Sequence, residues 1–152
     1  MKLIRLFLHE RTVEIMLKIL EAQEENKKIY PLQISNELGS PYSYISKVLG
    51  DFERNSLVES KHEGRIRSLY LTEFGIKIAK LLRELKIELN KDFNARKKLK
   101  ILNNILENEN DRDFRTLAPV LAELEIIGRT THDEEVKRRV EKMRRIVEEM
   151  IQ

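Results

Sequence analysis

Apolar residues recur every three or four positions over most of the chain, and this spacing places them on one face of a helix. Residues 57–72 differ from this pattern, because β-branched, aromatic and leucine residues are concentrated on both sides of Gly64. Residues 1–8 fit either a short edge strand or the ragged start of the first helix. The predicted helices cover residues 10–26, 31–38, 41–55, 73–90, 95–108, 114–127 and 134–152, and the predicted strands cover residues 57–62 and 66–72. The pattern therefore predicts a mainly α fold with one small β-hairpin.

Residues with strong conformational preferences mark the ends of these elements. Ser40, Thr72 and Asp133 have the side chains that cap helix N-termini, with Pro41 as a favourable first helical residue. Gly39 and Gly128 are expected to end the helices before them. Residues 108–111 are expected to form a polar loop.

Pro119 lies awkwardly within a helical pattern, because proline has no backbone N–H to donate. Either it occupies the first turn of its helix, where that N–H is not needed, or the helix is kinked there.

The helix predicted over residues 41–55 has two contrasting faces. Its apolar face carries Ile45, Val48, Leu49 and Phe52. The opposite face is small and polar, with Tyr42 and Tyr44 on its flanks, and it consists of Ser43, Ser46, Lys47, Gly50 and Arg54. Small polar residues let a helix approach base edges, while Lys47 can bind a base or a phosphate. The alternative is an ordinary solvated face.

The predicted hairpin turns at residues 63–65 and carries Lys61, His62, Arg65 and Arg67 around Gly64. A flexible tip with arginine suits a narrow minor groove or adjacent phosphates. Glu63 weakens this basic field, and an ordinary charged hairpin is the alternative.

The order of these parts is that of a winged helix-turn-helix, in which the hairpin is the wing. Residues 10–90 resemble such domains in prokaryotic transcription regulators of the MarR, ArsR and related families. The resemblance rests on "ISKVL" followed by "FERNSLVE", and on "RSLYLTEFG" with Thr72 and Gly75. It implies a dimeric DNA-binding protein, with Ser43, Tyr44, Ser46 and Lys47 near bases or phosphates and Arg65 on the wing. The full set of expected DNA-contacting residues is Ser40, Tyr42, Ser43, Tyr44, Ser46, Lys47, Arg54, Lys61, Arg65 and Arg67.

We expect two domains, a winged helix domain over residues 1–92 and a helical region over residues 93–152 used for packing or dimerisation. Two helices carry apolar stripes with nearly the spacing of a coiled-coil seam. The expected dimerisation residues on them are Leu82, Leu85, Leu89, Val140, Met143 and Val147. An intramolecular core is the rival interpretation, since any helix of a bundle shows such a stripe.

The composition argues against metal binding and catalysis. The chain has no cysteine and three histidines far apart in sequence, so neither a thiolate nor a histidine-rich metal site is expected. No glycine-rich phosphate loop or distinctive carboxylate pair is present, and we expect neither an enzyme nor a cofactor. The net charge of +3 is only a mild preference for anionic partners, so any DNA affinity must come from local placement of charge.

Other features bear on the location, the source and the ligands of the protein. No apolar run approaches the roughly 20 residues that a membrane span needs, so no membrane partner is expected and a cytoplasmic location is predicted. Charged residues reach 36%, which is compatible with a thermophilic, archaeal source and equally with a mesophilic protein of long helices. A small-molecule effector is possible, but no convergent polar set indicates one.

The leading hypothesis is therefore sequence-selective binding of double-stranded DNA by a homodimeric transcription regulator. The alternative is a protein–protein adaptor that uses its winged helix as a docking module.

Overall fold

The computed structural model describes residues 2–108 and 113–152, and the chain divides into two compact units, Met1–Glu88 and Leu89–Gln152. Each unit has its own hydrophobic core. The division lies close to the domain boundary expected after residue 92. Most of the predicted polar loop at 108–111 lies outside the described residues.

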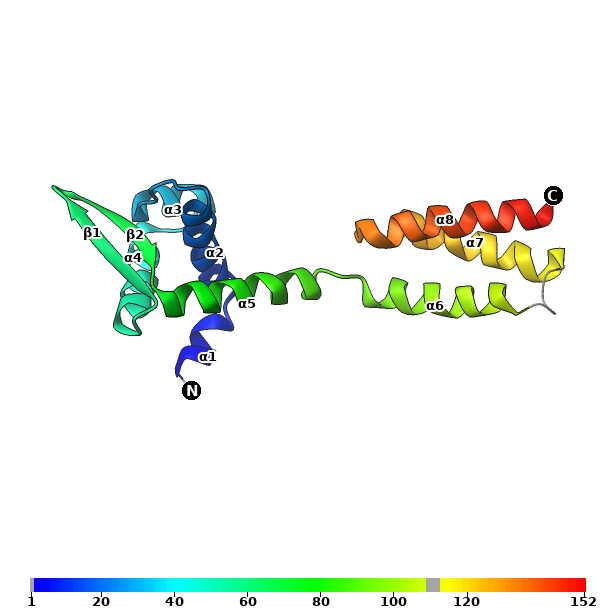
Figure 1. Cartoon of the computed structure of the whole chain (residues 1–152), viewed down its shortest axis with the longest axis horizontal. Helices are drawn as coiled ribbons and strands as arrows, with labels where there is room; N and C mark the ends of the chain where they lie inside the picture. Colours follow the sequence, from blue (N-terminus) through cyan, green and yellow to red (C-terminus); the bar gives the residue numbers. More distant parts are fainter. Residues whose placement is uncertain (1, 109–112) are drawn as a thin grey trace. The chain divides into compact units, whose positions relative to one another are not determined.

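The first unit contains a bundle of short helices with a projecting hairpin (Figure 1). Its elements are α1 (Lys2–Phe7), α2 (Glu10–Glu24), α3 (Pro31–Leu38), α4 (Tyr42–Arg54), β1 (Val58–Glu63), β2 (Ile66–Leu71) and α5 (Glu73–Leu89). The predicted mainly α fold with a small β-hairpin is confirmed. The start of the chain is a separate helix, α1, so the edge-strand alternative is wrong.

The wing is the antiparallel hairpin β1–β2, with Val58 opposite Leu71 and Glu63 opposite Ile66. Gly64 adopts a positive φ of 66° at its turn, a conformation that glycine tolerates without strain. The backbone of the wing is bonded to the connection between α2 and α3, because the Leu69 N–H donates to the carbonyl of Ile29 at 2.9 Å.

The turn between α3 and α4 begins as the sequence predicts and then differs. Gly39 ends α3 in the left-handed conformation with φ 61°, which confirms its role. Ser40 does not cap α4, because Pro41 occupies the N-cap position and the helix begins at Tyr42. Ser40 is instead buried, and its carbonyl accepts a hydrogen bond from the Ser35 hydroxyl at 2.6 Å. The small Ser35 side chain thus closes the turn from within.

The core of the first unit lies between α2, α4 and the base of the wing. The residues predicted to face it from α4, namely Ile45, Val48, Leu49 and Phe52, are all buried. Phe52 also stacks on Phe7 of α1, with ring centroids 5.8 Å apart. This packing anchors α4 by its apolar face and leaves the opposite face to solvent.

The second unit is a bundle of three helices, α6 (Phe93–Glu107), α7 (Phe114–Thr130) and α8 (Glu134–Ile151), in which α7 runs opposite to its two neighbours (Figure 1). Val140, Met143 and Val147 are buried in the core of this bundle. Their prediction as dimerisation residues is wrong, because the seam on α8 packs against α6 and α7 of its own chain.

Two predictions about α7 also need correction. Gly128 does not end the helix, which continues to Thr130. A β-carbon at Gly128 would lie 3.2 Å from a methyl group of Val140, so the glycine instead allows α7 and α8 to approach closely. Pro119 lies inside α7, beyond its first turn, so the alternative that placed it in the first turn is wrong.

The predicted caps at Thr72 and Asp133 are confirmed. The Thr72 hydroxyl accepts from the Gly75 N–H at 3.1 Å at the start of α5. The Asp133 carboxylate accepts from the N–H groups of Glu135 and Val136 at 3.1 and 3.3 Å at the start of α8.

Within the described part of the chain, none of the helices combines the length and the apolar character needed to cross a membrane.

Candidate nucleic-acid interface

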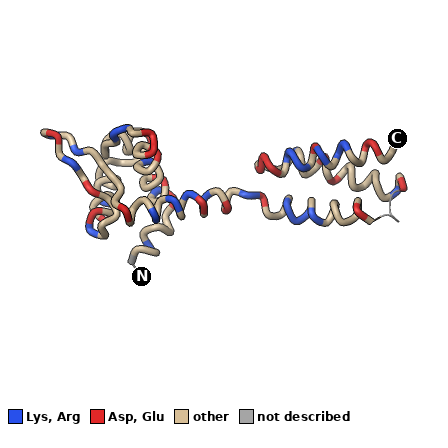
Figure 2. Tube along the Cα trace, in the orientation of Figure 1, with Lys and Arg blue, Asp and Glu red and all other residues tan. Residues whose placement is uncertain are grey.

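Basic and acidic residues are interspersed along the helices of both units (Figure 2). Neither unit is a polycation, so a nucleic-acid site must be recognised from the placement of particular side chains. Two elements of the first unit present such side chains, the outer face of α4 and the wing.

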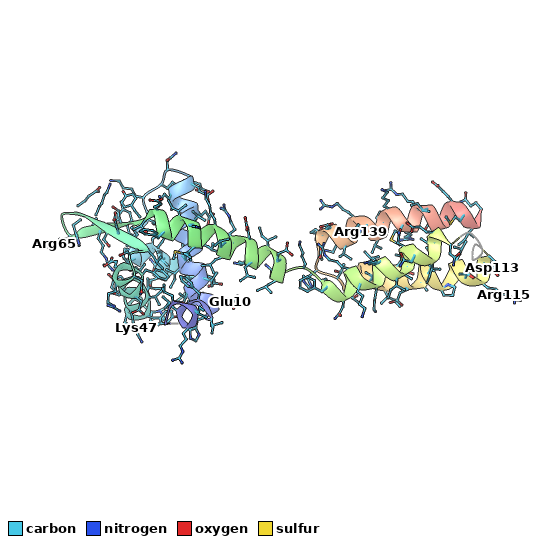
Figure 3. All side chains as sticks on the ribbon, turned by 60° about the horizontal axis from the view of Figure 1, so that its bottom comes forward. Glu10, Lys47, Arg65, Asp113, Arg115 and Arg139 are labelled. Carbon is cyan, nitrogen blue, oxygen red and sulfur yellow. The ribbon has the colours of Figure 1, made fainter. Side chains whose placement is uncertain are left out.

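The outer face of α4 presents Ser43 and Lys47 to solvent, while Ser46 is half-buried. Lys47 extends from the surface of the unit, as does Arg65 on the wing (Figure 3). Within residues 2–108 and 113–152, neither Lys47 nor Arg65 forms an ion pair. Both cations are therefore available to an anionic partner.

The two tyrosines at the start of α4 have different environments. Tyr42 is 49% exposed, whereas Tyr44 is half-buried and packs against the core of the first unit. Tyr42 is therefore the better placed of the two for a contact with a partner.

Three predicted contact residues are engaged within the chain. Arg54, at the end of α4, forms an ion pair with Asp51. The Lys61 ammonium lies 4.7 Å from the ring centroid of Tyr70, a cation–π contact. Ser40 is buried in the turn before α4, as described above.

Arg67 is also engaged, because one of its guanidinium nitrogens lies 3.3 Å from a carboxylate oxygen of Glu53 on α4. The same oxygen accepts a hydrogen bond from the Ser60 hydroxyl at 2.5 Å. Sequence reasoning missed Glu53 and Ser60, since their contacts join a helix to a hairpin across 7 and 14 residues. The expected pairing of the two strands does not predict these contacts, because strand pairing does not determine which side of the wing faces α4.

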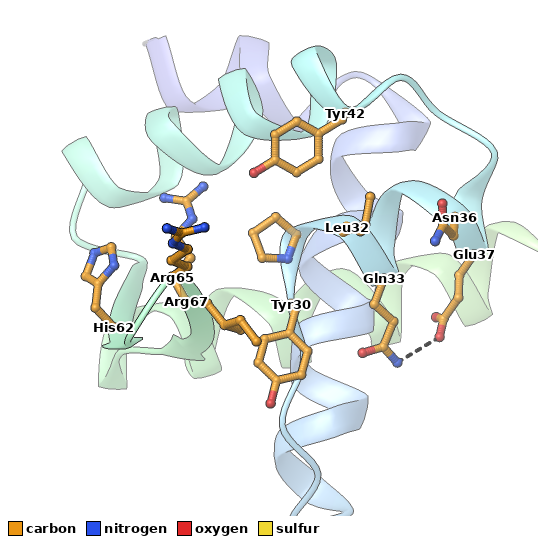
Figure 4. A pocket seen from close by; sticks show the side chains of 11 residues that line it. Tyr30, Leu32, Gln33, Asn36, Glu37, Tyr42, His62, Arg65 and Arg67 are labelled. Carbon is orange, nitrogen blue, oxygen red and sulfur yellow. Dashed lines mark hydrogen bonds between the residues drawn. The ribbon is translucent and has the colours of Figure 1, made fainter.

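A hollow of about 690 Å³ lies between the wing, α3 and the start of α4 (Figure 4). The Tyr42 hydroxyl is turned toward the side of the hollow from which Arg65 and Arg67 extend. Apolar and cationic side chains thus share one concave surface beside α4. Its lining consists of Tyr30, Pro31, Leu32, Gln33, Asn36, Glu37, Tyr42, His62, Arg65, Ile66 and Arg67.

The tip of the wing is also held by an ion pair. The Lys28 ammonium, in the connection between α2 and α3, donates to both carboxylate oxygens of Glu63 at 2.7 and 2.9 Å. The hydrogen bond to Glu63 raises the pKa of Lys28. Glu63 is thereby neutralised locally, which reduces its opposition to the neighbouring Arg65.

Comparison with known proteins supports this description of the first unit. No protein-family model matches the chain. An uncharacterized protein from Archaeoglobus fulgidus is 30% identical over 82 residues, which cover 54% of this chain and 86% of that protein. The crystal structure of AF1382 from Archaeoglobus fulgidus superposes with a TM-score of 0.54 at 29% identity, covering 59% of this chain and 98% of that one.

A more distant likeness covers more of the chain. A mutant of MepR from S. aureus superposes with a TM-score of 0.50 at 18% identity, covering 81% of this chain and 85% of that one. MepR is a transcription regulator of the Staphylococcus aureus multidrug efflux pump MepA.

The first unit is therefore a winged helix-turn-helix, and the predicted resemblance to this class is confirmed. The chain belongs to the same family as the uncharacterized Archaeoglobus fulgidus protein.

Proposed function

We propose that this protein binds double-stranded DNA sequence-selectively and regulates transcription. The observation that carries the proposal is the two-faced character of α4. Ile45, Val48 and Phe52 hold one side of the helix in the core, while Ser43 and Lys47 remain exposed on the other. A helix anchored in this way can enter the major groove with its polar side toward the base edges.

In this proposal α4 is the recognition helix. Ser43 contacts base edges or phosphates with its hydroxyl, and Lys47 contacts a base or a phosphate. Tyr42 lies at the helix start, where its side chain can reach the sugar-phosphate backbone. Arg65 on the wing contacts the adjacent minor groove or its phosphates.

The protein is further proposed to act as a homodimer. Leu81, Leu85 and Leu89 are exposed along one side of α5, and Ile4 and Leu8 are exposed in and just after α1. Apolar side chains repeated along a helix are suited to packing against a second copy. Two recognition helices would then read half-sites about one helical turn, or ~34 Å, apart. Leu82 has a different role, because it is half-buried and packs against the core of the first unit.

Two further considerations support a regulator. MepR, which shares the fold, regulates transcription. This support is an analogy of fold, and function depends on the particular side chains of the site. Those side chains, described above, are cations and small polar groups suited to binding rather than to catalysis.

Selection of bound duplexes from a random pool by the full-length chain tests this function directly. The proposal predicts enrichment of a palindromic sequence, because a two-fold dimer presents the same helix to two half-sites. The adaptor alternative predicts no enrichment and no binding to random duplex at micromolar protein, even at low salt. An enriched sequence without symmetry would support DNA reading but contradict the homodimer.

A further inference from the structure

One carboxylate on the recognition helix contacts both strands of the wing. Glu53 lies near the C-terminal end of α4, and one of its oxygens accepts from Ser60 of β1 at 2.5 Å and approaches Arg67 of β2 at 3.3 Å. Both strands of the wing are thus attached to the same atom of the helix that is proposed to read DNA.

The contact between Glu53 and Arg67 is partly buried. The side chains of Arg67 and Glu53 are 25% and 35% exposed, whereas those of the Lys28–Glu63 pair near the wing tip are 51% and 52% exposed. Exposed ion pairs contribute little and are screened by salt. A partly buried carboxylate that holds two donors is more persistent. Of these two braces, the one at Glu53 is therefore the better suited to set the angle between wing and helix.

The same contact distinguishes the two arginines of the wing. Arg65 and Arg67 both line the hollow beside α4, but only Arg67 has a carboxylate partner among the described residues. A neutralised guanidinium releases few counterions when DNA binds, because it is already paired.

We propose that Glu53 is a positioning residue for DNA recognition, which fixes the wing on α4 through Ser60 and Arg67 and leaves Arg65 as the wing's DNA-contacting cation. The inference rests on the proposed DNA-binding function and adds a division of labour to it. Arg67, which the sequence predicts to contact DNA, has a structural role in this account.

The test measures the salt dependence of binding to a selected duplex and to random duplex, using the full-length chain. Arg65→Ala is expected to reduce the slope of log K against log salt by about 0.9, the value of one phosphate contact. Arg67→Ala is expected to leave that slope unchanged while weakening binding to the selected duplex. A slope loss for Arg67→Ala equal to that for Arg65→Ala would overturn the division of labour.

Glu53 itself is tested by a pair of substitutions. Glu53→Ala frees Arg67 and releases the wing, so affinity for the selected duplex should fall about tenfold, while affinity for random duplex should be equal or higher. Glu53→Gln keeps an acceptor oxygen and should restore most of the lost selectivity. Glu59→Ala, which removes an exposed carboxylate from β1, is the control for the change in charge.

The outcomes separate this inference from the function on which it rests. If the wild-type chain shows no salt-dependent duplex binding, the proposed function fails. If the wild-type chain binds but Glu53→Ala and Glu59→Ala change the ratio of selected to random affinity equally, Glu53 is not a positioning residue. A parallel loss of both affinities and of the melting temperature in Glu53→Ala would likewise contradict the inference.

Discussion

The carboxylate of Asp133 accepts two hydrogen bonds from the guanidinium of Arg96, at 2.8 and 3.1 Å. Asp133 also caps α8 and accepts from the backbone N–H of Asp92, at 3.0 Å. Its side chain is only 6% exposed. One carboxylate therefore fastens the start of α6 to the start of α8 within the second unit.

Replacing Arg96 by alanine is expected to destabilise the second unit. The substitution leaves a nearly buried carboxylate without its guanidinium partner, which costs more than the loss of an exposed pair. Lys98→Ala is the matched control, because Lys98 pairs with Glu123 at the surface of the same bundle. Hydrogen exchange in α6 and α8 measures the effect, and equal protection in the two variants would contradict this role for Asp133.

The stability of the second unit should also fall in acid. The hydrogen bond from Arg96 holds the pKa of Asp133 well below its usual value. In the unfolded chain this carboxyl binds a proton at about pH 4, whereas in the folded chain it is still ionised at that pH. The unfolded state therefore takes up more protons as the pH falls, and stability decreases below that pH. Asp133→Asn should make the stability less dependent on pH in this range. A pH profile of unfolding that is the same in Asp133→Asn and the wild-type chain would contradict this role of Asp133.

Gly75 is expected to tolerate no side chain. A β-carbon there would overlap the carbonyl oxygen of Leu57, which also accepts from the N–H of Thr72 at 3.0 Å. Gly75→Ala should therefore lower the free energy of unfolding of the first unit by about 3 kcal/mol. All four tyrosines lie in this unit, so tyrosine fluorescence reports its denaturant unfolding.

Gly50→Ala provides the control for that measurement. A β-carbon at Gly50 would lie 3.3 Å from the end of the flexible Arg54 side chain. Alanine is favoured over glycine within a helix by roughly 1 kcal/mol, so this variant should be neutral or slightly stabilised. Similar losses in both variants would contradict the close approach of Gly75 to the base of the wing.

Homodimerisation through α5 can be tested with two apolar residues of similar exposure. Leu85 on α5 is 53% exposed and Ile101 on α6 is 50% exposed. Leu85→Glu should weaken dimerisation at least tenfold, because it places a charge in an apolar interface at a cost of several kcal/mol. Ile101→Glu should leave it unchanged. Sedimentation equilibrium measures both, and a dimer unaffected by Leu85→Glu would exclude this surface.

The sequence predicts local features of this protein better than it predicts contacts between elements. Gly39, Thr72 and Asp133 are recognisable because a left-handed turn or a helix N-terminus selects their residue types directly. Gly128 is misread, because a glycine that admits a neighbouring helix is the same in sequence as one that ends a helix. The role of Val140 is also ambiguous in sequence, since a heptad stripe fits an internal bundle and a dimer equally.

In the candidate site, too, the sequence predicts local features better than contacts between elements. The exposed polar side of α4 follows from its spacing, because the apolar residues of one helix determine which face remains outside. The burial of Ser40 and the engagement of Arg67 by Glu53 depend on how the turn and the wing pack against the helices. Such contacts join positions far apart along the chain, and residue type alone does not reveal them.

If α4 is the recognition helix, its exposed side contacts DNA in the complex. The most direct test of this contact is a salt titration of binding to a selected duplex by the wild-type chain, by Lys47→Ala and by Lys142→Ala, which removes an exposed lysine from α8 as a control. We expect weaker binding by Lys47→Ala, with a slope reduced by about 0.9 if Lys47 contacts a phosphate, and an unaltered curve for Lys142→Ala. Wild-type affinity and slope in Lys47→Ala would contradict this role of α4.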